Sequence, residues 1–299
     1  RLNAFGFLAH PALSAESKDG VSGNYALYDA IAALDWVRQN IAAFGGDPEN
    51  VTIGGQSAGC NMTMCLTVSP LTRGKYAKVI YNSGVRVGKD EYFRDITLQE
   101  AEAQGVEFMK AHGCGSIDEL RELPPEKIME ITSFEENMTG LGFRQFSDGV
   151  ALLDGVGQEL LHGHSDDVPF LCCYTADEGE REPGRRQIIP QGTLAFCENQ
   201  LDLGRKPVYA FRFSRMLPGD DEGAWHTSEL FYMFETIGRT WRRMTGYDFE
   251  LQTRMADYFA NFVKTGDPNG DALPFWTPFT KASQKAMDLG TIDGMMKVK

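Results

Sequence analysis

The sequence predicts an α/β protein in which a mostly parallel sheet carries helices on both faces. Short strand-like segments alternate with longer segments whose apolar residues recur at helical spacing, which is the order typical of parallel sheets. One strand-like segment, residues 168–174, is apolar throughout, as expected where both faces of a sheet are covered. With 299 residues, of which 42% are hydrophobic, the chain is long and apolar enough to bury a large core.

The first part of the chain predicts two strands and two helices in alternation. Apolar residues at helical spacing indicate a helix over residues 27–44, and Gly45-Gly46-Asp47-Pro48 ends it. Residues 50–53 read as a short β-branched strand, residues 60–66 as an apolar helix, and residues 78–83 as the next strand. Because a helix separates the two strands, we expect them to run parallel.

The middle of the chain differs in character from the rest. Residues 86–147 are rich in charge, and glycines and prolines interrupt their helical patches. We therefore predict a helical insertion that covers the edge of the sheet or the functional site. The chain then divides into residues 1–85, the insertion at 86–147 and residues 148–299, all within one partial domain.

The last part supplies further strands and a helix. Residues 168–174 and 207–213 read as strands, and an amphipathic helix spans residues 251–262 and ends at Gly266-Asp267-Pro268. Residues 179–192 are charged and contain two prolines, so we expect a loop there.

Composition excludes some classes of partner. The 29 basic and 42 acidic residues leave a net charge of −13, which argues against a nucleic-acid partner. No apolar run reaches the roughly 18 residues of a membrane span. The six cysteines lack the spacing of a zinc site, and we expect buried free thiols. Oligomeric state and cellular location are not determined by the sequence.

The segment Gly55-Gln56-Ser57-Ala58-Gly59 is the most informative motif. It lies between a predicted strand and a predicted helix, and a serine in Gly-x-Ser-x-Gly at such a junction is typical of the nucleophile elbow of an α/β-hydrolase. We expect both glycines to be required because the turn is sharp and crowded. The helix that follows offers free N–H groups and the positive end of its dipole to an oxyanion.

A serine nucleophile needs a base and an acid that orients the base. In this fold the acid and the histidine follow the serine in that order, at the ends of later strands. Glu178 and its neighbour Asp177 follow the strand at 168–174, and His226 follows the strand at 207–213. Both carboxylates remain candidates on this reasoning. The four other histidines are weaker candidates, because they do not follow the acid in the chain or do not lie at the end of a predicted strand: His10, His112, His162 and His164.

Further motifs cover the chain from near its beginning to near its end. They are Gly23-Asn24-Tyr25-Ala26-Leu27-Tyr28-Asp29, the segment 40–53, Ser57-Ala58-Gly59, Asp177-Glu178-Gly179, the loop around His226, and Lys264-Thr265-Gly266-Asp267-Pro268-Asn269. Together with residues 1–8, these segments resemble the type B carboxylesterases, the family of the para-nitrobenzyl esterases and cholinesterases.

The resemblance implies a role for individual residues. It implies Ser57 as nucleophile, His226 as base, Glu178 rather than Asp177 as acid, and the N–H of Ala58 as an oxyanion donor. Ser83 matches a family serine that is buried near the triad, although a strand-end hydroxyl that satisfies the backbone is an equal interpretation. Gln56 stands where many relatives carry glutamate, and we expect it to tune the surroundings of the serine.

The resemblance implies hydrolysis of small carboxylic esters through an acyl-enzyme, without a metal or organic cofactor. The alternative is a catalytically inactive binding or adhesion module, or an inactive gene fragment. The family's His-Gly-Gly oxyanion loop does not occur in this sequence. We therefore expect the chain to be the C-terminal portion of a longer enzyme and to lack full activity by itself, since losing one oxyanion donor typically costs roughly 10²–10³ in rate.

Overall fold

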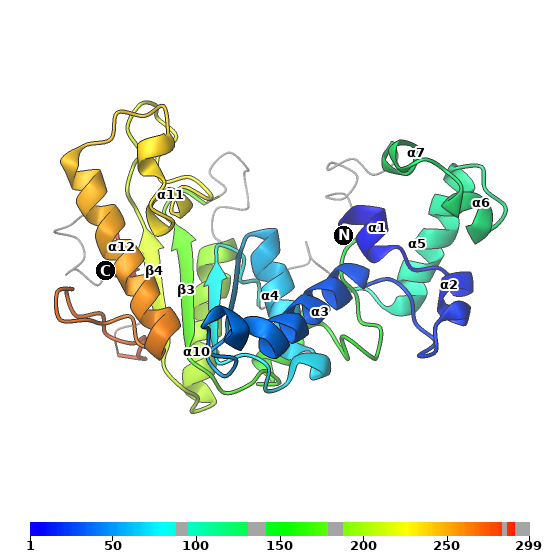
Figure 1. The fold of residues 1–299 in the computed structure, drawn as a ribbon, viewed down its shortest axis with the longest axis horizontal. Coiled ribbons are helices and arrows are strands. Elements are labelled where there is room, and N and C mark those ends of the chain that lie inside the picture. The colour runs from blue at the N-terminus through cyan, green and yellow to red at the C-terminus, as the bar shows by residue number, and fades with distance from the viewer. Residues whose placement is uncertain (88–94, 131–141, 179–187, 283–285, 291–299) are drawn as a thin grey trace.

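A parallel sheet forms the centre of the molecule (Figure 1). The computed structural model describes residues 1–87, 95–130, 142–178, 188–282 and 286–290. Within these residues the sheet has five strands in the order β1-β2-β3-β4-β5, and each strand runs parallel to its neighbours. The strands are β1 (Thr52–Gln56), β2 (Lys78–Asn82), β3 (Phe170–Thr175), β4 (Val208–Phe213) and β5 (Met287–Asp288). The predicted parallel sheet is therefore confirmed, and β1 lies at one edge.

Helices cover both faces of this sheet. The helices of the first face are α3 (Tyr25–Asn40), α4 (Ala58–Val68), α9 (Val156–Leu161) and α10 (Ile188–Asp202). The helices of the second face are α11 (Leu230–Met233) and α12 (Gly246–Thr265). Short 3-10 turns lie at η1 (Ile41–Phe44), η2 (Pro70–Thr72) and η4 (Ile237–Arg239).

Side-chain alternation along the strands separates two hydrophobic cores. In β2, Val79 and Tyr81 belong to the core on the α4 face, whereas Ile80 belongs to the core on the α12 face. In β3, Leu171 and Cys173 point toward the α12 face. β3 is buried at every residue, and it is apolar up to Tyr174, as the apolar run at 168–174 predicted for a strand covered on both faces.

Local sequence signals determine where α12 begins and ends. Thr245 and Asp248 form a capping box at its start, and Gly266 ends it with a backbone φ of 84°. The helix is longer than the periodic segment at 251–262, because it begins at the capping box and continues to Thr265.

The N-terminal segment and the middle of the chain form a lobe beside the sheet, on the right of Figure 1. Its helices are α1 (Asn3–Phe7), α2 (Pro11–Glu16), α5 (Leu98–Ala111), α6 (Ile117–Arg121) and α7 (Pro125–Met129). Ala4 of α1 shares a small core with Phe108, Ile117 and Ile128. The predicted insertion boundaries at 86 and 147 remain a prediction, and residues 88–94 and 131–141 lie outside the described part.

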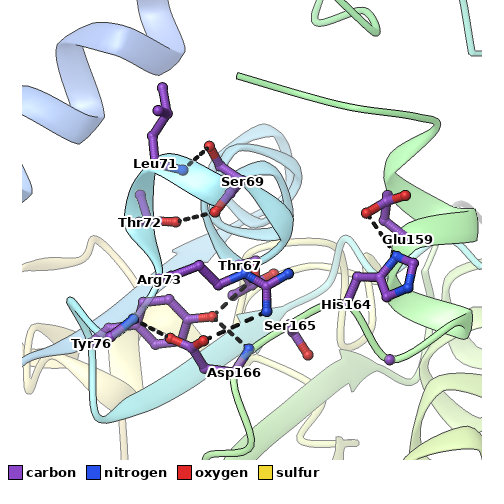
Figure 2. Close-up of polar contacts among 12 residues, drawn as sticks. Thr67, Ser69, Leu71, Thr72, Arg73, Tyr76, Glu159, His164, Ser165 and Asp166 are labelled. Carbon is purple, nitrogen blue, oxygen red and sulfur yellow. Dashed lines mark hydrogen bonds and ion pairs between the residues drawn. The ribbon is translucent and has the colours of Figure 1, made fainter. Parts of the chain in front are cut away.

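Polar contacts join the segments that lead into β2 and β3 (Figure 2). Asp166 accepts a hydrogen bond from the N–H of Gly74 at 2.7 Å and lies 3.8 Å from the guanidinium of Arg73. The Tyr76 hydroxyl donates to the carbonyl of Thr67 at 3.0 Å and accepts from the N–H of Asp166 at 3.3 Å. These contacts hold together the segments that precede the amino ends of β2 and β3.

The loop predicted over residues 179–192 is partly wrong. Residues 179–187 lie outside the described part, but α10 already begins at Ile188 and includes Pro190 and Gly192. Proline is tolerated in the first turn of a helix because the N–H it lacks would have no partner there. A Cβ on Gly192 would lie 2.4 Å from the carbonyl oxygen of Val85, so this glycine allows the helix to approach the segment after β2 closely.

The structure also bears on the cysteines and on the search for a membrane-spanning segment. All six cysteines are free thiols and five are buried, as predicted. Among the described residues, no helix is long and apolar enough to cross a membrane.

Candidate active site

Ser57 lies at a sharp turn between β1 and α4. Its backbone adopts φ 55° and ψ −117°, a conformation that residues with a side chain rarely adopt. The turn is held by a hydrogen bond of 2.9 Å from the N–H of Ser57 to the carbonyl of Asn82 at the end of β2. This turn places Ser57 at the carboxyl edge of the sheet, directly before the first turn of α4.

The two glycines of the motif have different functions in this turn. A Cβ on Gly55 would lie 2.2 Å from the carbonyl oxygen of Gly59, whereas a Cβ on Gly59 would have nothing within 4 Å. The expectation that crowding requires both glycines is therefore correct for Gly55 and wrong for Gly59. A third glycine is required instead: a Cβ on Gly84 would lie 2.6 Å from the carbonyl oxygen of Ser57.

His226 and Glu178 form a short hydrogen bond at the same edge of the sheet. The Nδ1 atom of His226, in the loop after β4, lies 2.7 Å from Oε2 of Glu178, which follows β3. The other carboxylate oxygen of Glu178 accepts from the N–H of Thr175 at 3.1 Å, and the side chain is 2% exposed. Asp177 instead accepts from the N–H of Ala224 at 2.6 Å. The structure therefore pairs the histidine with Glu178.

The second nitrogen of His226 faces Gln56. Its Nε2 lies 3.3 Å from the amide nitrogen of Gln56, and within the described part of the chain no hydrogen bond joins His226 to the Ser57 hydroxyl. Burial lowers the pKa of His226, but the hydrogen bond and charge of Glu178 and the charge of Glu229 outweigh it and leave the pKa above 6.5. The ring is part-buried, with 35% of its side chain exposed.

Ala58 and Ser83 lie beside Ser57. The N–H of Ala58, at the start of α4, donates to no acceptor in the described residues, as the helix N-terminus predicts. Ser83 is fully buried, and its hydroxyl has no hydrogen-bond partner in the structure. The interpretation of Ser83 as a hydroxyl that satisfies the backbone is thus wrong, because only its N–H bonds the backbone, at Cys173.

Sequence reasoning missed Glu229, three residues after His226. Its side chain is fully buried, and neither carboxylate oxygen has a hydrogen-bond partner. Burial and the neighbouring charge of Glu178 raise the pKa of Glu229 to about 7. A glutamate in a loop is usually exposed, so no local signal in the sequence distinguished it from its neighbours.

Stability should therefore depend on the protonation of Glu229. Between its ordinary pKa of 4.5 and the folded value of about 7, the folded state retains a proton that the unfolded state has lost. The free energy of unfolding should fall as pH rises through this window, by about 3 kcal/mol from this group. We expect Glu229→Gln to be more stable than the wild type at pH 8 and to show a flatter dependence on pH.

Urea unfolding of both proteins at pH 5 and pH 8 measures this difference. Glu235→Gln, which alters an exposed glutamate nearby, should keep the wild-type dependence on pH. Equal pH dependence in the wild type and in Glu229→Gln would contradict the expectation.

A cavity of about 570 Å³ lies beside β1, between the sheet and the two helices of the second face. Gln56 forms part of its wall. Most of the remaining lining is apolar and comes from β1, β2, α11 and α12: Thr52, Gly54, Gly55, Ile80, Asn82, Leu230, Met233, Phe234, Ala256, Phe259, Ala260 and Val263. The side chain of Gln56 therefore has open space next to it.

The remaining histidines lie in other contacts. His10 caps α2 by accepting from the N–H of Ala12, and His112 bonds the carbonyl of Phe108. His164 pairs with Glu159 (Figure 2), and the exposed His162 lies next to it, with 5.8 Å between the two ring centres. No group of three or more His, Cys, Asp or Glu residues in the described ranges could hold a metal ion.

A parallel sheet with helices on both faces, a strained serine between a strand and a helix, and a carboxylate–histidine pair at later strand ends define an α/β-hydrolase. The match to solved structures agrees with this class: a PNB esterase superposes with a TM-score of 0.81 at 23% identity, over 97% of this chain and 68% of the other. At this identity the match establishes the fold.

The chain belongs to the carboxylesterase family, whose model matches residues 1–182 and 187–298. A fumonisin B1 esterase of Sphingopyxis macrogoltabida is 28% identical over 95% of this chain and 61% of its own length. A para-nitrobenzyl esterase of Bacillus subtilis (strain 168) is 32% identical over 60% of this chain and 36% of its own. The chain thus spans less than two thirds of the length of these curated relatives.

Proposed function

We propose that the chain carries the catalytic residues of a serine carboxylic-ester hydrolase that acts through an acyl-enzyme. The observation that supports this most is the 2.7 Å hydrogen bond between His226 and Glu178, at the same edge of the sheet as Ser57. The family and the names of the esterase relatives support ester hydrolysis as the reaction class.

In the first half-reaction the Ser57 hydroxyl attacks the ester carbonyl while Nε2 of His226 accepts its proton. Glu178 holds Nδ1–H, so the imidazole is presented as the tautomer with a free Nε2 lone pair. The same carboxylate stabilises the imidazolium that forms. The carbonyl oxygen becomes an oxyanion, which accepts a hydrogen bond from the free N–H of Ala58 and is stabilised by the positive end of the α4 dipole.

The imidazolium then gives its proton to the leaving alcohol, and the acyl group remains on Ser57. Water enters, loses a proton to His226 and attacks the acyl carbon. The second oxyanion collapses and the bond between the acyl carbon and the Ser57 oxygen breaks, so the carboxylic acid leaves while His226 returns its proton to the serine oxygen. Every proton moves through His226, and the chemistry requires no cofactor.

Covalent labelling tests the role of Ser57. We expect a fluorophosphonate to add one phosphonyl group to the chain, with the label at Ser57 in peptide mass spectrometry, and we expect Ser57→Ala to abolish it. Ser83→Ala is the matched control, because Ser83 is a serine of the same edge and is fully buried; it should still be labelled at Ser57. Labelling at another serine, or none, would contradict the proposal, and the absence of labelling would favour an inactive binding module.

A further inference from the structure

Nε2 of His226, the nitrogen that acts as base in the proposed reaction, already has a hydrogen-bond partner in the structure, and this partner is not Ser57. Nε2 of His226 lies 3.3 Å from the amide nitrogen of Gln56, the last residue of β1 and the residue before Ser57. Within the described part of the chain, the Ser57 hydroxyl makes no hydrogen bond to this ring. The side chain of Gln56 is therefore bonded to the Nε2 atom that must accept the proton of Ser57 in the proposed reaction.

The partners of the ring decide the direction of this hydrogen bond. Glu178 is an acceptor at Nδ1, so the ring proton lies on Nδ1 and Nε2 carries the lone pair. The amide nitrogen of Gln56 can only donate, and it therefore donates to Nε2. This bond favours the neutral ring, because an Nε2–H of an imidazolium would face the amide hydrogens.

From this geometry we propose that Gln56 is a positioning residue that caps the base nitrogen of His226: in the resting site its amide donates a hydrogen bond to Nε2. When a ligand binds, this bond breaks and the Ser57 hydroxyl donates to Nε2 instead. The inference rests on the proposed function, since it concerns how the same base is presented. It assigns to Gln56 a specific hydrogen bond, in place of a general influence on the surroundings of the serine.

The surroundings allow the amide to leave. Gln56 forms part of the wall of the cavity of about 570 Å³ beside β1, so its side chain can rotate away from the ring without displacing a core residue.

Other charged groups act on His226 at the same time. Glu178 after β3 and Glu229 in the histidine's own loop stabilise the imidazolium, and Arg86 after β2 opposes it. These groups are unchanged in a variant of Gln56, so a difference between such variants isolates the contribution of the amide.

NMR of the 15N-histidine-labelled chain tests the cap without turnover. The variants are Gln56→Met, which keeps the length of the side chain but removes the donor, and Gln56→Glu, which replaces the donor with an acceptor. We expect the pKa of His226 to rise by about half a unit in Gln56→Met and by one unit or more in Gln56→Glu. His226→Asn assigns the resonances, and His164, paired with Glu159 elsewhere, should give the same signals in all three proteins.

The rate of Ser57 phosphonylation at pH 8 gives a second readout. Removing the cap should make Gln56→Met react about fivefold faster than the wild type, as expected for the loss of one hydrogen bond. An identical His226 titration in the three proteins, or a slower reaction of Gln56→Met, would overturn the inference. Failure of the proposed function can be told apart from failure of this inference. If the proposed function is wrong, Ser57 is not labelled, but the titration of His226 still reports whether Gln56 bonds the ring.

Discussion

Glu178→Gln is expected to slow phosphonylation of Ser57 by roughly 10²–10⁴-fold at pH 8. The N–H of Thr175 donates to one oxygen of Glu178 at 3.1 Å, and this donor requires an oxygen at that position. The amide oxygen of the variant must therefore face Thr175, which turns its NH₂ group toward Nδ1 of His226. The ring then takes the tautomer with its proton on Nε2 and can no longer accept the proton of Ser57.

Asp177→Asn is the matched control for this experiment. Asp177 accepts from the N–H of Ala224, and an amide oxygen can make the same bond. We expect its phosphonylation rate to stay within a few fold of the wild type. Thermal melting of both variants verifies that they are folded. A large loss in Asp177→Asn with little change in Glu178→Gln would assign the acid to Asp177 instead.

Gly55→Ala is expected to destabilise the chain by about 3 kcal/mol and to displace Ser57. The new Cβ would lie 2.2 Å from the carbonyl oxygen of Gly59 and 2.3 Å from its carbon, both of which are backbone atoms of α4. Neither can move without shifting the start of this helix, and Ser57 lies between the two contacting residues. The change should therefore lower stability and the rate of phosphonylation together.

Gly59→Ala is the control within the same motif. Nothing lies within 4 Å of its Cβ position, and the residue is in the first turn of α4. Because alanine loses less backbone entropy than glycine in a helix, we expect its stability to equal or exceed that of the wild type by up to about 1 kcal/mol. Urea unfolding of both variants measures the contrast, and equal destabilisation would show that the turn is crowded at both glycines.

Much of the fold could be predicted because its signals are local. The apolar run at 168–174 predicts the buried strand observed as β3, and the glycine that ends α12 lies where the sequence indicates a helix stop. The serine motif predicts the strand–turn–helix that surrounds Ser57. The boundaries differ by a few residues because caps and pairing, not periodicity, determine where an element begins and ends.

Other features depend on contacts between distant parts of the chain. The core that joins α1 to α5 and α6 combines residues about one hundred positions apart, and no periodicity reveals it. The proline and glycine at the start of α10 predict a loop, because both residues usually interrupt a helix. They are tolerated here because the proline lies in the first turn and the glycine lies against Val85. Glu229 and the bond from Gln56 to His226 require knowledge of which way side chains point.

The sequence by itself determined the strand and helix order, the serine motif and the chain order of its candidate partners, because these depend on neighbouring residues and on the geometry of parallel sheets. The pairing of His226 with Glu178 was implied by the resemblance to the carboxylesterases, but only the tertiary structure decided that the other nitrogen of His226 faces Gln56 and that Glu229 is buried nearby. Those outcomes depend on loops that come together at the ends of three strands, where distances of a few ångströms determine which donor meets which acceptor.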